Sequence, residues 1–165
     1  MIRKCFYSFH YEPDNWRVSQ VRNIGSLEDN KPVSDNSWEE VKKGGEQAIK
    51  NWILNQLNGR SCAIVLAGKE TAGRKWISYE ISEAWNKGMG VVVVYIHNLK
   101  NSKGLQSTKG GNPLSYVTMN RDNSKLSSIA KAYDPPYTDS AKVYEYITSN
   151  LESWVEEAIK IRNNY

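Results

Sequence analysis

Two almost uninterrupted apolar runs constrain the fold of this chain more than any other feature. They are "SCAIVLAG" at residues 61–68 and "GVVVVYIHN" at residues 90–98. A strand with one face in water alternates apolar and polar residues, whereas a strand buried on both faces is apolar throughout. Because a segment with a helical pattern separates the two runs, they are predicted to be parallel strands inside an α/β domain.

The segment between these strands, residues 74–88, has the pattern of an amphipathic helix. Trp76, Glu80 and Ala84 recur every four residues, so they share one helical face. Gly88 is a typical residue at a helix end. A carboxylate on a face that also carries tryptophan is either an exposed salt-bridge partner or a functional group. Glu80 is therefore the first candidate site residue.

The other elements complete the same pattern. An aromatic-rich strand is predicted at residues 4–11, and Pro13 and Asp14 mark the start of a helix that runs to about Asn23. The polar, glycine- and proline-containing residues 25–35 are predicted to be a long loop.

The second half of the chain has one unclear region. A helix is predicted at residues 37–59, a surface loop at 98–113 and a long closing helix at 139–164. Between them, either "SYVTMN" or "SSIAKAY" could be a strand.

These elements predict a flavodoxin-like three-layer α/β sandwich with a mostly parallel central sheet, in a single domain over residues 1–165. In such sheets, ligands bind beyond the carboxyl ends of the strands. The functional site is therefore expected at residues 9–14, at residues 69–74 and at the start of the helix that carries Trp76 and Glu80.

Composition excludes several function classes. The net charge is only +4, and the 22 basic residues are scattered, so neither a nucleic-acid tail nor a membrane-binding tail is predicted. Two cysteines, Cys5 and Cys62, form no disulfide framework, and with two histidines the chain is poorly supplied for a metal site. The N-terminal residues lack a signal-peptide pattern and no segment approaches 18 apolar residues, so a cytoplasmic protein is expected.

Common nucleotide and catalytic fingerprints are missing from the sequence. It contains no G-x-G-x-x-G after the first strand, no G-x-x-x-x-G-K-[ST] loop and no G-x-S-x-G elbow. A phospho-receiver domain would need an aspartate at the end of its central strand, where this chain has "VLAGKE". The α/β layout therefore needs another functional assignment.

The start of the chain and the helix at residues 74–88 together resemble a known family. "FYSFHYEPD" and "WISYE" are similar to the first strand and the Trp-x-x-x-Glu helix of TIR domains. The segments "YSFHYEPDNWRVSQVRN", "SWEEVKK" and "RKWISYEI", which lie within residues 6–81, resemble the ThsB-type TIR proteins of bacterial Thoeris anti-phage defence. Ile77 stands where many TIR domains have a cysteine.

The resemblance implies an enzyme that uses NAD as a substrate and needs no other cofactor. In catalytic TIR domains, the helix glutamate cleaves the bond between nicotinamide and ribose, and the match assigns that role to Glu80. The Thoeris branch implies a cyclic ADP-ribose isomer as product, which signals to a separate effector protein. Plain NAD hydrolysis, a non-catalytic TIR-like adaptor and a receiver-like domain remain as alternatives.

Aromatic residues around Glu80 are expected to contact the dinucleotide. Trp76, one turn before Glu80, would form a wall beside the ribose or base. Phe9 and Tyr11 could stack on nicotinamide or adenine, and His10 could donate a hydrogen bond to a hydroxyl or phosphate. The alternatives are that Trp76 and Phe9 are core residues and that His10 is a satisfied histidine at a strand end.

Charged residues near the same edge are weaker candidates. Asp14 and Asp35 are plausible polar contacts, although Asp14 could equally cap a helix. Arg74 and Lys75 could face the pyrophosphate with help from the positive helix end, or could simply be solvated.

Regulation is expected to come from outside the active site. Unchecked loss of NAD is toxic, so the resting enzyme should be quiet. Activation is predicted to occur through assembly into a homo-oligomer or through binding of a phage component.

Overall fold

The computed structural model describes residues 3–24 and 41–165. Within them, four parallel strands form one sheet in the order β1-β2-β3-β4. They are β1 (Cys5–Phe9), β2 (Cys62–Ala67), β3 (Gly90–Tyr95) and β4 (Ala132–Tyr133). The predicted parallel α/β sheet is confirmed.

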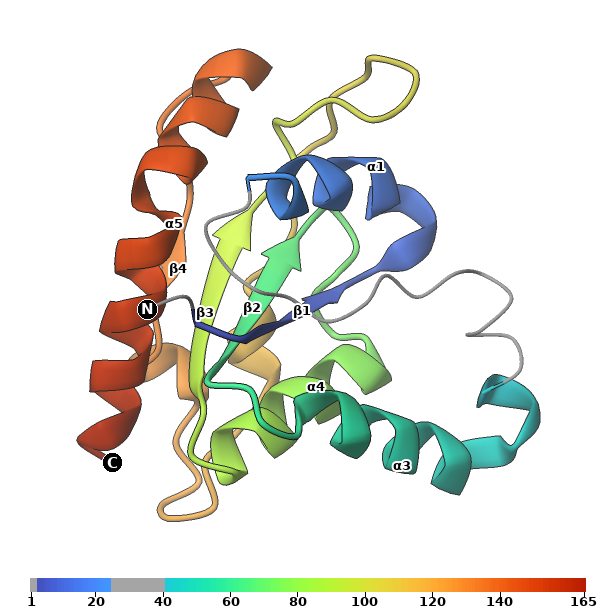
Figure 1. Cartoon of the computed structure of the whole chain (residues 1–165), viewed down its shortest axis with the longest axis vertical. Coiled ribbons are helices and arrows are strands. Elements are labelled where there is room, and N and C mark those ends of the chain that lie inside the picture. The colour runs from blue at the N-terminus through green and yellow to red at the C-terminus, as the bar shows by residue number, and fades with distance from the viewer. Residues whose placement is uncertain (1–2, 25–40) are drawn as a thin grey trace.

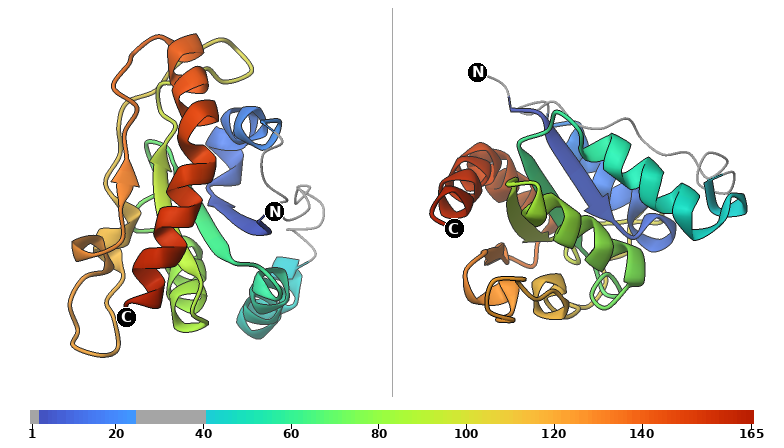
Figure 2. Two further views of the ribbon diagram at one scale, coloured as in Figure 1. Left: turned by 60° about the vertical axis from the view of Figure 1, so that its left-hand side comes forward. Right: turned by 90° about the horizontal axis from the view of Figure 1, so that it is seen from below.

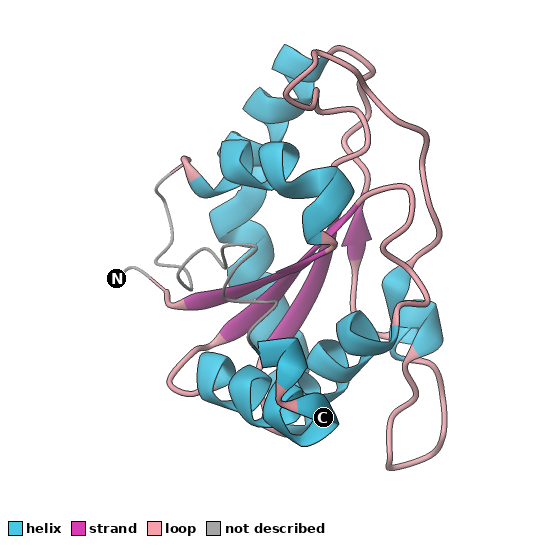
Figure 3. Cartoon of the chain, turned by 90° about the vertical axis from the view of Figure 1, so that its right-hand side faces the viewer, coloured by secondary structure: helices cyan, strands magenta, loops and turns pink. Residues whose placement is uncertain are grey.

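Helices cover both faces of this sheet (Figures 1 and 3). They are α1 (Tyr11–Arg22), α3 (Gly45–Leu57), α4 (Lys75–Asn86) and α5 (Ser140–Asn163). The α3 and α4 helices pack on one face, and α1 and α5 pack on the other (Figure 2). This is the expected three-layer TIR-like sandwich. Within the described residues, no helix is both long and apolar enough to cross a membrane.

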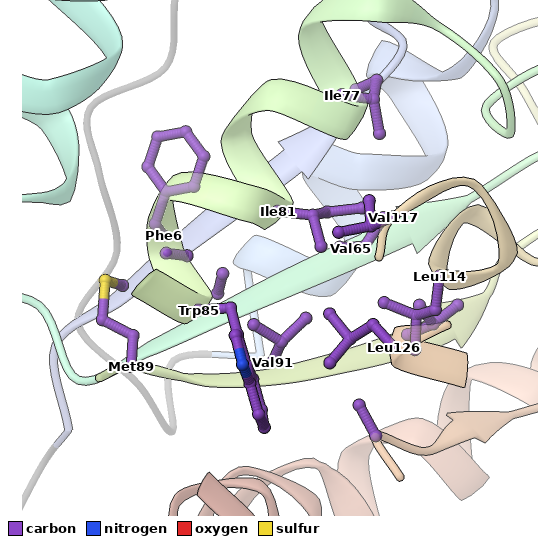
Figure 4. Packing of buried hydrophobic residues seen from close by; sticks show 14 of the residues in the cluster. Phe6, Val65, Ile77, Ile81, Trp85, Met89, Val91, Leu114, Val117 and Leu126 are labelled. Carbon is purple, nitrogen blue, oxygen red and sulfur yellow. The ribbon is translucent and has the colours of Figure 1, made fainter. Parts of the chain in front are cut away.

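Each face of the sheet has its own hydrophobic core. Phe6, Val65 and Val91 of the strands belong to the same cluster as Ile81 and Trp85 of α4 (Figure 4). Every residue of β2 and β3 is buried. The two runs are apolar throughout because helices cover both faces of these two strands, as the sequence predicted.

Register decides which strand residues face the functional helix α4. In β1, Ser8 pairs with Val65 and Phe9 pairs with Leu66. Successive side chains of a strand point to opposite faces. Ser8 therefore shares a face with Phe6, toward α4, whereas Phe9 points toward α1 and α5.

The junction between β1 and α1 differs from its predicted form. The strand ends at Phe9, two residues earlier than predicted, and the helix already begins at Tyr11. Pro13 lies inside the first turn, where a missing N–H breaks no helical hydrogen bond. The proline is thus compatible with an earlier helix start than its position suggested.

The helix predicted at residues 37–59 is also shorter where the structure describes it. Residues 41–43 are helical, but Gly45 has φ of +82°, so the continuous α3 helix begins only there. The predicted loop at residues 25–35 and the predicted start of this helix lie outside the described residues.

The unclear region at residues 114–132 contains little regular structure. Short 3-10 helices form at Pro113–Tyr116 and Leu126–Ser128. Of the two candidate strands, "SSIAKAY" supplies the two-residue β4, whereas "SYVTMN" contributes only an isolated bridge from Thr118. The closing helix is confirmed as α5.

Candidate active site

The helix α4 places Glu80 beside its buried stripe. Ile77, Ile81 and Ala84 face the sheet and are at most 5% exposed. Glu80 lies on the flank of this stripe, one turn after Trp76, and is half-buried. The face shared by Trp76, Glu80 and Ala84 therefore runs along the border between the core and the carboxyl edge of β1.

The carboxyl group of Glu80 is held in a largely desolvated environment. Although part of the residue remains accessible, protein surrounds the carboxyl, and this burial raises the pKa of Glu80 to about 8. The Ser8 hydroxyl acts in the opposite direction and lowers that pKa. The two groups face each other without a hydrogen bond of standard geometry, and the 1% exposed Ser8 hydroxyl has no other partner in the described chain. Burial therefore favours the neutral form of Glu80 at pH 7, in contrast to an ordinary surface carboxylate.

Trp76 is fixed at the edge of the core. Its half-buried ring packs against the hydrophobic cluster under α4 and meets the Tyr79 ring edge-on at 5.6 Å between centroids. The Lys75 ammonium lies 4.9 Å from the Trp76 ring centroid. Lys75 also forms an ion pair with Glu46 on α3, so its charge is directed away from a pyrophosphate.

His10 and Arg74 come together from different parts of the sequence. His10 directly follows β1, and Arg74 directly precedes α4. The pKa of His10 is lowered mainly by burial and also by the Arg74 charge, and Glu70 and Glu12 oppose this shift. The His10 Nδ1 atom is buried and has no hydrogen-bond partner in the part of the chain that is described. The imidazole is therefore neutral at pH 7 and retains hydrogen-bonding capacity.

Phe9 and Tyr11 are neighbours, but the Phe9 side chain points to the face of the sheet opposite Glu80. Their ring centroids are 6.3 Å apart, and both residues are half-buried. Phe9 packs against the core between the sheet, α1 and α5, which is the opposite face from Glu80. The structure thus brings Tyr11 and His10 to the edge after β1 and places Phe9 in the packing of α1.

Asp14 is part of a buried ion pair. It is 1% exposed, and its carboxylate lies 3.0 Å from Nη1 of Arg17. Arg17 also donates to the backbone oxygens of Leu99 and Leu105. A Cβ added to Gly68 would come within 2.2 Å of the Asp14 carboxylate.

The expected capping role of Asp14 is wrong, because α1 begins three residues earlier, at Tyr11, with His10 at the N-cap. The other acidic candidate, Asp35, lies outside the described residues.

A hollow at the far side of the sheet is not part of this arrangement. It lies at the end of β3, is lined by His97 and the residues that lead into α5, and has a volume of about 470 Å³. Glu80 faces β1, the opposite edge strand. We place the candidate active site on the Glu80 side, because that side holds the buried acid and its neighbours.

Comparison with known proteins assigns more than half of the chain to one family. Residues 6–101 match the family described as the TIR-like domain of the Thoeris protein ThsB. The chain belongs to this ThsB family. The matched residues include α1, β2, α4, β3 and all of β1 except Cys5, and therefore Ser8, His10, Arg74, Trp76 and Glu80.

The chain is also similar to a curated protein whose name describes a reaction. The chain is 36% identical over 122 residues to the protein named "Putative cyclic ADP-D-ribose synthase ThsB1" of Bacillus cereus (strain MSX-D12). The similarity covers 71% of this chain and 64% of the relative, so the chain spans just under two thirds of the relative's length.

One residue of this candidate site did not stand out as a site candidate in the sequence. Ser8 is the polar side chain that acts on Glu80, and it lies in an otherwise apolar stretch of buried strand. Its two-residue spacing from Phe6 could have placed it on the α4 face. The described residues contain no group of three His, Cys, Asp or Glu side chains that could hold a metal ion.

Proposed function

We propose that this chain cleaves the bond between nicotinamide and ribose in NAD and joins the remaining ADP-ribose into a cyclic nucleotide signal. The observation that carries the proposal is the desolvated carboxyl of Glu80 beside Trp76, at the carboxyl edge of a ThsB-type TIR-like domain. The name of the similar protein from Bacillus cereus supports the cyclic product.

The chemistry assigned to Glu80 is electrostatic. When the carbon–nitrogen bond breaks, nicotinamide leaves as a neutral molecule and the ribose carbon becomes oxocarbenium-like. An ionised Glu80 beside that ribose stabilises the positive charge, most strongly where water is excluded. A nucleophilic atom of the same ADP-ribose then forms a bond to the ribose carbon, and its proton leaves to solvent. One carboxylate suffices, because nucleophile and electrophile belong to one bound molecule.

Neighbouring residues position the substrate in this proposal. Trp76 forms the wall beside the ribose or base, and Tyr11 offers a second aromatic surface. The neutral imidazole of His10 donates a hydrogen bond to a hydroxyl or phosphate, and Arg74 faces the pyrophosphate. Asp14 contributes indirectly, because it pairs with Arg17, whose hydrogen bonds to the Leu99 and Leu105 backbone oxygens hold α1 against the loop after β3.

We also propose a cellular role for the reaction. The nucleotide acts on a separate effector protein in the cytoplasm of a phage-infected cell. A phage component or assembly of the chain into a homo-oligomer triggers its synthesis. We expect no role for nucleic acid, membrane or metal ion.

The first experiment is mass spectrometry of nucleotides from phage-infected cells that express the chain or its Glu80→Gln variant. We expect an NAD-derived species lacking nicotinamide, with the mass of ADP-ribose minus one water, only where Glu80 is present. Glu83→Gln is the matched control, since Glu83 lies on the same helix and is half-buried. Free ADP-ribose in place of the cyclic species would instead indicate a plain NAD hydrolase. Identical nucleotides and equal phage protection with and without Glu80 would indicate a non-catalytic adaptor.

A further inference from the structure

The hollow at the end of β3 lies apart from the Glu80 site. It opens between residues 97–98, which follow β3, and residues 134–142, which lead from β4 into α5. Its volume of about 470 Å³ is within the range of small-molecule sites. Because neighbouring strands are about 4.8 Å apart, β3 lies roughly 10 Å across the sheet from β1, which Glu80 faces.

His97 shows that the hollow has unused hydrogen-bonding capacity. The residue lines the hollow and is only 7% exposed. Its Nδ1 atom is buried and has no hydrogen-bond partner among the residues that the structure describes. Leaving such an atom unpaired costs free energy. A bound molecule would remove that cost only if the His97 ring turned its Nδ1 toward the hollow, because the atom is buried in this structure.

The start of α5 adds a positive end to the same hollow. The helix has 24 residues, and the side chain of its N-cap residue, Asp139, accepts no hydrogen bond from the first turn. Unsatisfied N–H groups and the helix dipole favour a phosphate at such a position. Lys142 lines the hollow and forms no ion pair in the described part of the chain, so its ammonium group is available to the same phosphate.

The remaining walls suit the other parts of a nucleotide. Tyr137 is 42% exposed and is held edge-on by Tyr146 at 5.8 Å between ring centroids, so it presents a fixed aromatic surface to a base. The Asp139 carboxylate does not cap the helix and can accept ribose hydroxyls. Asp134, by contrast, is paired with Lys109 at 3.1 Å. The nearly balanced charge does not suit a nucleic-acid polymer, which requires many basic contacts.

The hollow is also preformed. The Asn98 Nδ2 group donates to the Tyr137 backbone oxygen at 3.1 Å, and the Lys100 N–H donates to the Ser140 hydroxyl at 3.2 Å. Gln106 further bridges the two segments through the Thr138 backbone oxygen. Figure 1 shows the loop after β3 and the start of α5 together at the end toward which the strand arrows point. Little ordering cost would therefore oppose binding.

We propose that this hollow is a second site, which binds a nucleoside phosphate. The base stacks on Tyr137, the ribose hydroxyls bind the Asp139 carboxylate, and the phosphate lies at the start of α5 beside Lys142. The site is independent of the Glu80 chemistry.

The test is calorimetric titration of ADP into the full chain carrying Glu80→Gln, which keeps the proposed reaction out of the measurement. We expect saturable binding that weakens at least tenfold in the additional variants Lys142→Ala and Asp139→Ala. Lys160→Ala, an exposed lysine on the same helix, should leave binding unchanged. We also expect adenosine to compete with ADP.

Three results would overturn the proposal. The first is a lack of saturable ADP binding. The second is binding that Trp76→Ala abolishes and Lys142→Ala spares, which would place ADP in the proposed NAD site. The third is competition by inorganic phosphate with none by adenosine, which would indicate a simple anion site. None of these results depends on whether Glu80 is catalytic.

Discussion

The protonation state of Glu80 makes the proposed activity depend on pH. Its pKa is raised to about 8, because burial disfavours the ionised form that stabilises an oxocarbenium-like ribose. We expect kcat/KM for NAD to rise about tenfold per pH unit below pH 8 and to level off above it. The kcat profile should have a lower midpoint, since the positive nicotinamide ring of bound NAD favours the carboxylate. Initial rates between pH 5.5 and 9.5 measure both profiles.

Ser8 provides the control for this assignment. Its hydroxyl lowers the pKa of Glu80, so Ser8→Ala should move the kcat/KM midpoint to higher pH. Ser78→Ala, a change of the same chemistry on α4, should leave the midpoint in place. A midpoint that stays fixed when Ser8 is changed would assign the observed ionisation to another group.

The same burial predicts a stability effect that needs no substrate. A raised pKa in the folded state means that the neutral carboxyl contributes stability below pH 4.5, which is lost as the pH rises toward 8. Glu80→Gln keeps a neutral side chain at every pH. We expect the variant to match the wild type near pH 4 and to exceed its free energy of unfolding by on the order of 2–4 kcal/mol at pH 9. Urea denaturation at the two pH values measures this difference, and equal stability at pH 9 would mean that Glu80 is solvated.

At the scale of elements, Arg17 joins α1 to the loop after β3, because it donates to the Leu99 and Leu105 backbone oxygens while it pairs with Asp14 on its own helix. Arg17→Leu leaves the Asp14 carboxylate and the backbone oxygens of Leu99 and Leu105 without their donor. We expect a loss of about 3–5 kcal/mol in the free energy of unfolding, measured by chemical denaturation. The exposed cation control Lys160→Leu should cost much less. Similar small losses for both would show that the pair is dispensable.

The elements also show where the sequence was informative. Continuous apolar runs predicted β2 and β3, because burial on both faces leaves no position for a polar residue. The start of α1 was missed, since Pro13 is tolerated anywhere in a first turn. The helix break at Gly45 was missed because its positive φ is set by the surrounding chain.

In the candidate site too, some features could be predicted from the sequence and others could not. The proximity of His10 and Arg74 followed from the rule that strand ends meet at one edge. Strand alternation places the Phe9 side chain on the α1 and α5 face of the sheet, whereas its aromatic character alone had suggested a ligand contact. The partners of Arg17 could not be predicted, because they lie 82 and 88 residues further along the chain and carry no side-chain signal.

At the scale of the whole molecule, the proposed activity needs a means of control, because unchecked loss of NAD would be toxic. Because burial raises the pKa of Glu80 to about 8, the neutral form is favoured at pH 7, which would lower the proposed activity of the isolated chain. Any contact that brings positive charge to the carboxyl or completes the edge after β1 would raise the ionised fraction. Assembly of copies and binding of a phage component are both able to supply such a contact.

These two triggers differ in their dependence on concentration. If assembly completes the site, NAD turnover per chain should rise with protein concentration, in parallel with the oligomer fraction measured by light scattering. We expect this rise over roughly a hundredfold range of concentration, with low turnover at the dilute end. Constant low turnover, increased by lysate from phage-infected cells, would assign activation to a phage component. Constant high turnover would contradict both, because it would show that the single chain is already a complete and unregulated enzyme.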